Sequence, residues 1–210
     1  MSTYDLEEQE QLAALKAWWK DNGGGVMLGA TLVLAAVAAW YGWQAYQRSQ
    51  AAQAAALYDT LQKAARANDK KATSDAAGSI LENYPGSAYA PLAALVSAKV
   101  QFQAGDLKTA RAQLQWVVEH AKSEEIRSIA ALRLASVLLD DKDPEAALKA
   151  LDIKPHPSFE ALFASQRGDV LSVQKKRAEA RAAYRSALDK SEAGPLRETV
   201  RLKLEALGEG

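Results

Sequence analysis

Residues 23–43 read GGGVMLGATLVLAAVAAWYGW, and this stretch divides the chain into two unlike parts. It lies inside a longer run, residues 22–47, that contains no charged residue. As an α-helix rising ~1.5 Å per residue, residues 23–43 would extend about 31 Å, close to the ~30 Å hydrocarbon core of a bilayer. The sequence therefore predicts a single transmembrane helix over residues 23–43.

Aromatic side chains flank this stretch at both ends. Trp18 and Trp19 precede it, and Trp40 and Trp43 lie near its far end. An indole ring has an apolar body and a polar N–H, so it is most stable where hydrocarbon meets water. We expect these four tryptophans to be membrane-interface anchors, with the lipid bilayer as a partner.

Two other interpretations of residues 23–43 are a buried core helix and a cleaved signal peptide. Core helices are seldom this long without charge and with aromatic residues at both ends. The triplet Ala36-Val37-Ala38 has the form of a cleavage site, but an acid-rich segment precedes the stretch and apolar character continues to Trp43. A retained membrane anchor therefore fits the sequence best.

The orientation is encoded by few residues. Lys16 and Lys20 lie just before the span, whereas only Arg48 follows it closely. Because basic residues concentrate on the cytoplasmic side, the sequence favours a cytoplasmic N-terminus by a thin margin.

The overall composition excludes several function classes. The 26 basic and 26 acidic residues balance, so we expect no nucleic-acid partner. The chain contains no cysteine, which excludes disulfides, thiol catalysis and cysteine-bound zinc. The mean hydropathy of −0.24 is typical of a soluble protein, but it averages one apolar segment with a polar remainder. The abundance of alanine and of charged residues predicts a mostly helical chain.

A repeat occupies the chain after the apolar segment. Its marker is a short turn dipeptide that recurs at intervals of 37, 37 and 33 residues, at Asn68-Asp69, Gly105-Asp106, Lys142-Asp143 and Lys175-Lys176. A tetratricopeptide unit is a helix–turn–helix of about 34 residues, so the spacing predicts a stack of such units. A generic helical bundle is the alternative, and it would not require a shared spacing.

Small residues recur at fixed distances from each turn. At the closest helix crossings only Gly or Ala lets two backbones approach, so we expect these residues to pack at the crossings. The small residues concerned are Ala98, Ala110, Ala135, Ala147, Gly168 and Ala180.

The predicted fold is all-α: one N-terminal transmembrane helix followed by a tetratricopeptide-like solenoid. We expect a cytoplasmic acidic tail at residues 1–22, the span at 23–43 and a repeat domain at 44–210. The expected units are residues 50–86, 88–121, 125–153 and 158–190, with a capping helix over 195–207.

No combination of residues predicts catalysis. His120 is expected at a helix end, where a histidine ring interacts well with the terminal carbonyls, and His156 has no partner at ligand spacing. Residues 141–152 resemble a calcium loop only superficially, because Ala146 replaces the required glycine. We therefore expect no enzyme activity, metal, cofactor or small-molecule substrate.

The candidate site is instead the concave wall formed by the first helix of each unit. The residues expected there are Leu95, Lys99, Phe102, Leu132, Ser136, Leu139, Ser165 and Asp169. Each of them could equally belong to the interhelical core.

The chain resembles the YfgM-type family, the ancillary subunits of the Sec translocon in Gram-negative bacteria. The matching segments are Tyr4, residues 7–10, 15–20 (LKAWWK), 22–23, 42–43, 50–51, Ala55, Tyr58, and the dipeptides Gly105-Asp106 and Gly168-Asp169.

The resemblance implies a single-pass inner-membrane protein with a periplasmic repeat domain. It further implies association with the SecYEG translocon and with a membrane-anchored periplasmic chaperone, as a tethered scaffold that assists translocation and chaperone handover. The alternative is a tetratricopeptide adaptor that tethers another envelope or division complex at the inner membrane.

Overall fold

The computed structural model describes residues 3–208, and the side chains of residues 10–208. The family-matching residues Tyr4, Glu7, Glu8 and Gln9 lie outside the described side chains. The chain divides into two units, Met1–Gln50 and Ala51–Gly210, and we call the second the repeat domain. Within the described residues all regular structure is helical, which confirms the predicted all-α class.

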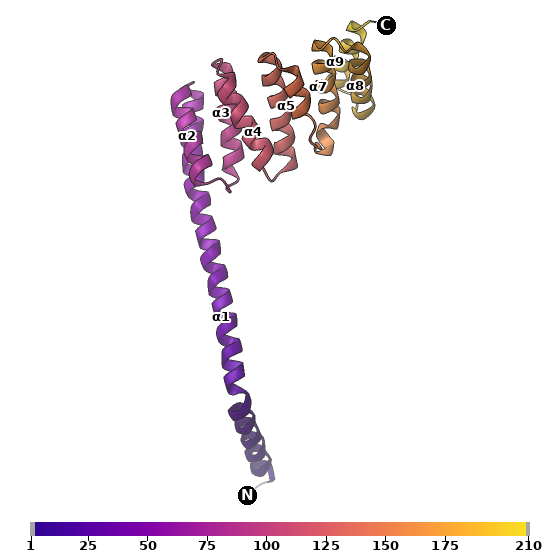
Figure 1. Ribbon diagram of the computed structural model, residues 1–210. Coiled ribbons are helices and arrows are strands. Elements are labelled where there is room, and N and C mark those ends of the chain that lie inside the picture. Colours follow the sequence, from indigo (N-terminus) through magenta and orange to yellow (C-terminus); the bar gives the residue numbers. More distant parts are fainter. Residues whose placement is uncertain (1–2, 209–210) are drawn as a thin grey trace. The chain divides into compact units, whose positions relative to one another are not determined.

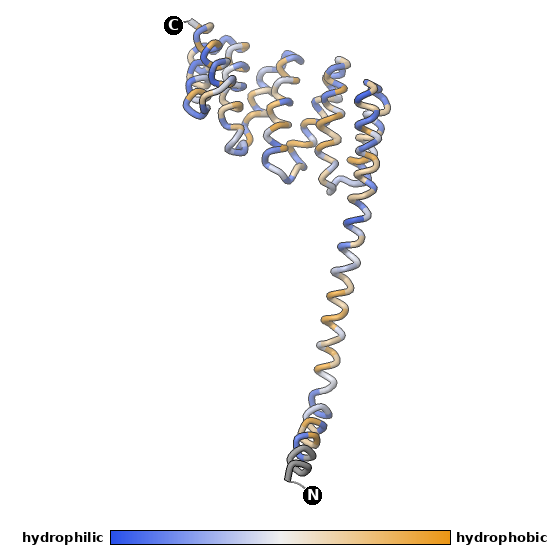
Figure 2. Tube along the Cα trace, turned by 180° about the vertical axis from the view of Figure 1, so that it is seen from behind, coloured by the Kyte–Doolittle hydropathy of each residue, from blue (hydrophilic) through white to orange (hydrophobic). Residues whose placement is uncertain are grey.

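Helix α1 (Thr3–Arg66) carries the predicted membrane-spanning residues. Among the described residues it is the helix long and apolar enough to cross a membrane. Hydrophobic residues follow one another along this part of α1 (Figure 2). The Thr31 hydroxyl donates a hydrogen bond to the Met27 carbonyl at 2.8 Å, so the one aliphatic hydroxyl in the apolar stretch is satisfied within its own helix. The predicted long apolar N-terminal helix is confirmed.

The repeat domain is a row of helix pairs (Figure 1). After the last turns of α1 it contains α2 (Lys70–Asn83), α3 (Tyr89–Gln103), α4 (Leu107–His120), α5 (Glu124–Asp140), α6 (Pro144–Ala150), a 3-10 turn (Pro157–Phe159), α7 (Glu160–Val173), α8 (Arg177–Lys190) and α9 (Pro195–Ala206). Sequential helices pack on each other, α3 on α4, α5 on α6, α7 on α8 and α8 on α9. This is the helix–turn–helix stack of a tetratricopeptide-like solenoid.

The turns within the pairs share one backbone conformation. Their first residues adopt a positive φ of 52–79°, at Asn68, Gly105, Lys142 and Lys175. In each turn the following amide donates to a carbonyl five residues back, as from Asp106 to Gln101 at 2.9 Å and from Asp143 to Leu138 at 2.9 Å. This is the left-handed Schellman ending of a helix. The dipeptide spacing seen in the sequence is therefore the spacing of one recurring helix ending.

The second residue of three turns also starts the next helix. Asp69, Asp106 and Asp143 each accept a hydrogen bond from a backbone amide three residues later, at 2.9–3.0 Å. Such a carboxylate satisfies an amide that otherwise lacks a partner at a helix N-terminus. The pKa of Asp106 is lowered, first by the hydrogen bond from the Thr109 amide. One dipeptide thus ends one helix and begins the next.

The predicted small residues lie in the interior of the repeat domain. Ala110, Ala135, Ala147 and Ala180 are fully buried and Ala98 is 3% exposed. Large apolar side chains such as Leu114, Leu134 and Phe163 form one core cluster with Ala98, Ala110, Ala135 and Ala147. In the first unit the position that corresponds to Ala110 is Thr73, which is also fully buried.

Candidate protein-binding groove

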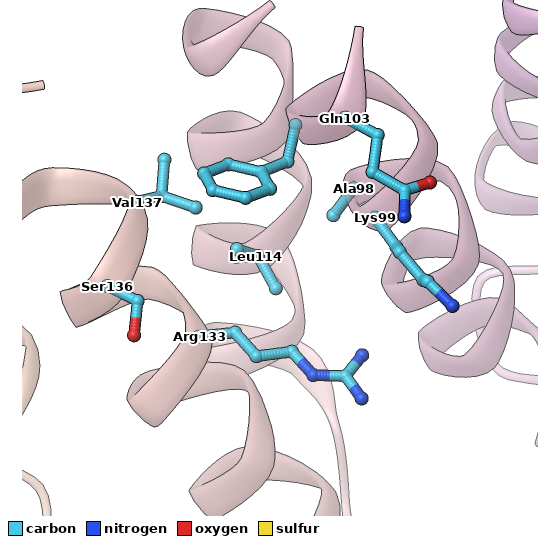
Figure 3. Close-up of a pocket in the computed structure, with 8 residues that line it drawn as sticks. Ala98, Lys99, Gln103, Leu114, Arg133, Ser136 and Val137 are labelled. Atoms are coloured by element: carbon cyan, nitrogen blue, oxygen red, sulfur yellow. The ribbon is translucent and has the colours of Figure 1, made fainter. Parts of the chain in front are cut away.

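Three adjoining hollows lie along the face formed by the first helix of each pair. The middle hollow lies between α3 and α5 and has a volume of about 400 Å³. Figure 3 shows Lys99 and Arg133 extending from the two helices, with Leu114 between them in the view. The residues that line it are Ala98, Lys99, Phe102, Gln103, Leu114, Arg133, Ser136 and Val137.

The other two hollows continue this one in both directions. One, of about 370 Å³, is lined from α5, α7 and α9 and shares Arg133 and Ser136 with the middle hollow. The other, of about 430 Å³, lies between the end of α1 and α3 and shares Lys99 and Gln103 with it. We call this continuous surface the A-face groove. A groove with several hollows along its length suits an extended or helical protein segment.

Most of the residues expected on the concave wall line this groove. Lys99 and Phe102 line the middle hollow, and Leu132, Ser165 and Asp169 line the one beside α9. Ser136 belongs to both, and its hydroxyl accepts a hydrogen bond from Gln166 of α7 at 3.1 Å. The first helices of successive pairs thus form one continuous wall of the groove.

Leu95 and Leu139 lie elsewhere. Leu95 is only 8% exposed and belongs to the core cluster, and Leu139 is partly buried against the same cluster. The reason is the composition of α3 and α5, where apolar residues occupy several faces of each helix. Hydrophobic periodicity then does not distinguish the groove face from the core face.

Several polar residues that the sequence analysis does not predict also line the groove, among them Arg133, Gln166 and Lys203. Arg133 lies on α5 one position after Leu132, Gln166 follows Ser165 on α7, and Lys203 comes from α9. The first two could have been found from the repeat register, because they are neighbours of predicted positions. Lys203 depends on how the capping helix docks, which the repeat spacing does not encode.

A hydrogen-bonded triad closes the α9 end of the groove. The Asp169 carboxylate accepts from the Tyr184 hydroxyl at 2.8 Å and pairs with the Lys203 ammonium at 2.7 Å. Burial, and secondarily this carboxylate, raise the pKa of Tyr184 to about 12. The triad joins α7, α8 and α9 and neutralises the Asp169 charge.

Gly168 makes the close approach of α7 and α8 possible. A Cβ atom at Gly168 would lie 2.4 Å from the Tyr184 ring, far inside contact distance. The sequence predicts a small residue at this crossing, and the structure shows that Gly168 faces an aromatic ring. Its role is to admit Tyr184, whose hydroxyl then reaches Asp169.

The predicted interface tryptophans lie in pairs on α1. Trp18 and Trp19 have ring centroids 6.4 Å apart, and those of Trp40 and Trp43 are 5.7 Å apart. All four side chains are at least half exposed. Exposed aromatic pairs at both ends of an apolar helix are suited to two membrane surfaces.

The histidines do not assemble a metal or acid–base site in the part of the chain that the structure describes. His156 Nε2 lies 3.3 Å from a Glu125 carboxylate oxygen, and His120 stacks on Trp116 at 4.8 Å. Within residues 10–208 no group of three potential metal ligands converges.

Comparison with known proteins gives one consistent result. The model of a tetratricopeptide repeat-like domain family matches residues 16–209. A protein of Neisseria gonorrhoeae named ancillary SecYEG translocon subunit is 35% identical over 96% of this chain and 98% of its own length. Proteins with the same name from Escherichia coli K12 and Haemophilus influenzae are 28% and 29% identical, over 99% and 80% of this chain and 99% and 81% of their own lengths.

Proposed function

The chain belongs to the family of ancillary SecYEG translocon subunits, and we propose that it acts as a membrane-tethered protein-interaction scaffold at the Sec translocon. The observation that carries this proposal is the match to the Neisseria gonorrhoeae subunit over almost the whole of both chains. The match spans the apolar helix as well as the repeats, which supports a role for both parts together.

The A-face groove supports a binding role over a catalytic one. Its hollows follow one another along a stack of helices and have no deep enclosed centre. Such a surface suits a segment of another protein, whereas a small-molecule site is usually a single concave pocket with convergent polar groups. This shape supports the proposal that translocating chains or partner proteins at the channel bind in the groove.

The proposed topology places residues 1–22 in the cytoplasm, residues 23–43 in the inner membrane and residues 44–210 in the periplasm. Lys16 and Lys20 before the span favour this orientation. In that arrangement the groove faces the compartment into which chains emerge. We further propose that a membrane-anchored periplasmic chaperone is a second partner, which receives those chains.

Affinity purification of the full chain in a mild detergent tests the proposal. We expect channel subunits to copurify, together with a membrane-anchored periplasmic chaperone, and a tagged unrelated single-pass membrane protein to recover neither. Recovery of envelope or division proteins without channel subunits would instead support a tethered adaptor of another complex.

A reporter fused to the C-terminal end tests the orientation. Alkaline phosphatase, which becomes active only in the periplasm, should be active there. An active cytoplasm-only reporter at the same position would overturn the periplasmic assignment.

A further inference from the structure

The A-face groove is positively charged although the chain as a whole is neutral. The basic residues that line its three hollows are Arg66, Lys99, Arg133 and Lys203, and the acidic one is Asp169. The chain carries equal numbers of basic and acidic residues. The groove is therefore a local concentration of positive charge.

The acidic residue does not reduce the charge of the middle hollow. Asp169 is paired with Lys203 at 2.7 Å and accepts from Tyr184 at 2.8 Å. Within residues 10–208 neither Lys99 nor Arg133 has an acidic side chain within ion-pair distance. Two cations on opposite walls of the same hollow are thus available to a bound anion.

The floor between these cations is apolar. Ala98, Leu114 and Val137 line it, and Phe102 is 37% exposed there. A small anion would pair with Lys99 or Arg133 but would leave the apolar side chains between them exposed to water. The lining therefore matches a ligand that presents an apolar side chain and a carboxylate on one short segment.

Building on the scaffold role proposed above, we infer that the hollow between α3 and α5 recognises an acidic, apolar segment of a partner protein. An apolar side chain of the segment packs over Leu114 and Val137. A neighbouring Asp or Glu pairs with Arg133, whose planar guanidinium can hold a carboxylate through two hydrogen bonds, or with Lys99. The groove discriminates against basic segments by like-charge repulsion.

Peptide binding to the full chain in neutral detergent micelles tests this inference. The probe is a fluorescent peptide of about 15 residues built from Glu, Phe and Ser, with the Glu and Phe residues separated by Ser. The comparison peptide has Lys at every position where the probe has Glu. We expect the wild-type chain to bind the Glu peptide at least about tenfold more tightly than the Lys peptide, with the preference weakening as salt rises.

Charge reversal at the hollow should invert that preference. The double variant Lys99→Glu/Arg133→Glu should bind the Glu peptide at least about tenfold more weakly and the Lys peptide more tightly than the wild type does. Gain of Lys-peptide binding also shows that the variant is folded. The matched control, Lys122→Glu/Arg185→Glu, makes the same change in charge at exposed positions outside the groove and should keep the wild-type preference.

Equal binding of both peptides by the wild type would overturn the inference, and so would equal losses in the two double variants. Displacement of the Glu peptide by phosphatidylglycerol in the micelles, with no difference between variants, would assign the charge to lipid headgroups and also overturn it. Copurification of channel subunits is measured separately, so the scaffold role can stand if this recognition fails.

Discussion

Two glycines in helices show how strongly the surroundings of one residue determine the effect of a substitution. Gly168 of α7 faces the Tyr184 ring, whereas Gly78 of α2 has no atom within 4 Å of the position of an added Cβ. The sequence correctly indicates that a small residue is needed at position 168, because its spacing matches that of Ala98 and Ala135. It does not show that the neighbour is an aromatic ring, since that depends on the tilt between α7 and α8.

We predict opposite effects for alanine at these two glycines. Gly168→Ala should lower the free energy of unfolding by about 1–3 kcal/mol, because the buried Tyr184 ring must move. Gly78→Ala should raise it by about 0.5–1 kcal/mol, because alanine costs less backbone entropy in a helix. Urea unfolding of the full chain in detergent, followed by circular dichroism, measures both. Equal effects would contradict the packing of Tyr184 against Gly168.

Tyr184 gives the molecule a stability change at high pH. Its hydroxyl has a pKa of about 12 in the folded chain and 10.0 as the ordinary value. Between these two values the unfolded chain releases a proton that the folded chain keeps, so the free energy of unfolding falls as pH rises. The limiting slope from this one group is about 1.4 kcal/mol per pH unit.

The variant Tyr184→Phe removes that titration. We expect its free energy of unfolding to fall less steeply than that of the wild type from pH ~10 to ~12, the two curves running parallel below pH ~9. The two chains differ at this one residue, so the difference between their curves reports the Tyr184 hydroxyl. Curves that stay parallel throughout would show that the Tyr184 hydroxyl is not held in its neutral form.

At the scale of elements, the turns could be predicted better than the faces of the helices. In three of the four turns a left-handed residue is followed by a capping aspartate, so the spacing of the turns is visible in the sequence. The groove face of α3 carries no such marker, and its apolar residues extend around the helix. The sequence therefore assigns Leu95 to the same face as Lys99 and Phe102. The structure places Lys99 and Phe102 in the groove and Leu95 in the core.

The short helix α6 should depend strongly on its capping residue. Asp143 accepts from the Ala146 amide at 3.0 Å, and the helix that it starts has seven residues. Asp143→Ala should lower the free energy of unfolding by about 1 kcal/mol. Asp143→Asn keeps the acceptor but loses the 3.8 Å pairing with Arg111, so it should cost only a few tenths of a kcal/mol. Equal losses, measured by urea unfolding, would assign the effect to the ion pair rather than to the cap.

At the scale of the whole molecule, the sequence separates a tether from an interaction surface. The tether could be predicted because a bilayer imposes a length and an absence of charge. The repeat architecture could be predicted from its period. The docking of α9, which brings Lys203 to Asp169, could not, because a capping helix need not repeat the register of the units it covers.

We propose that the A-face groove is the surface through which this chain binds proteins at the translocon. Site-specific photocrosslinking in cells tests it most directly, with a photoreactive amino acid at Ser136 in the groove or at Ala182 on the exposed face of α8. We predict that Ser136 yields adducts with channel subunits, chaperone or translocating chains, and that Ala182 yields few. Adducts of equal yield from Ala182, or none from Ser136, would contradict the claim.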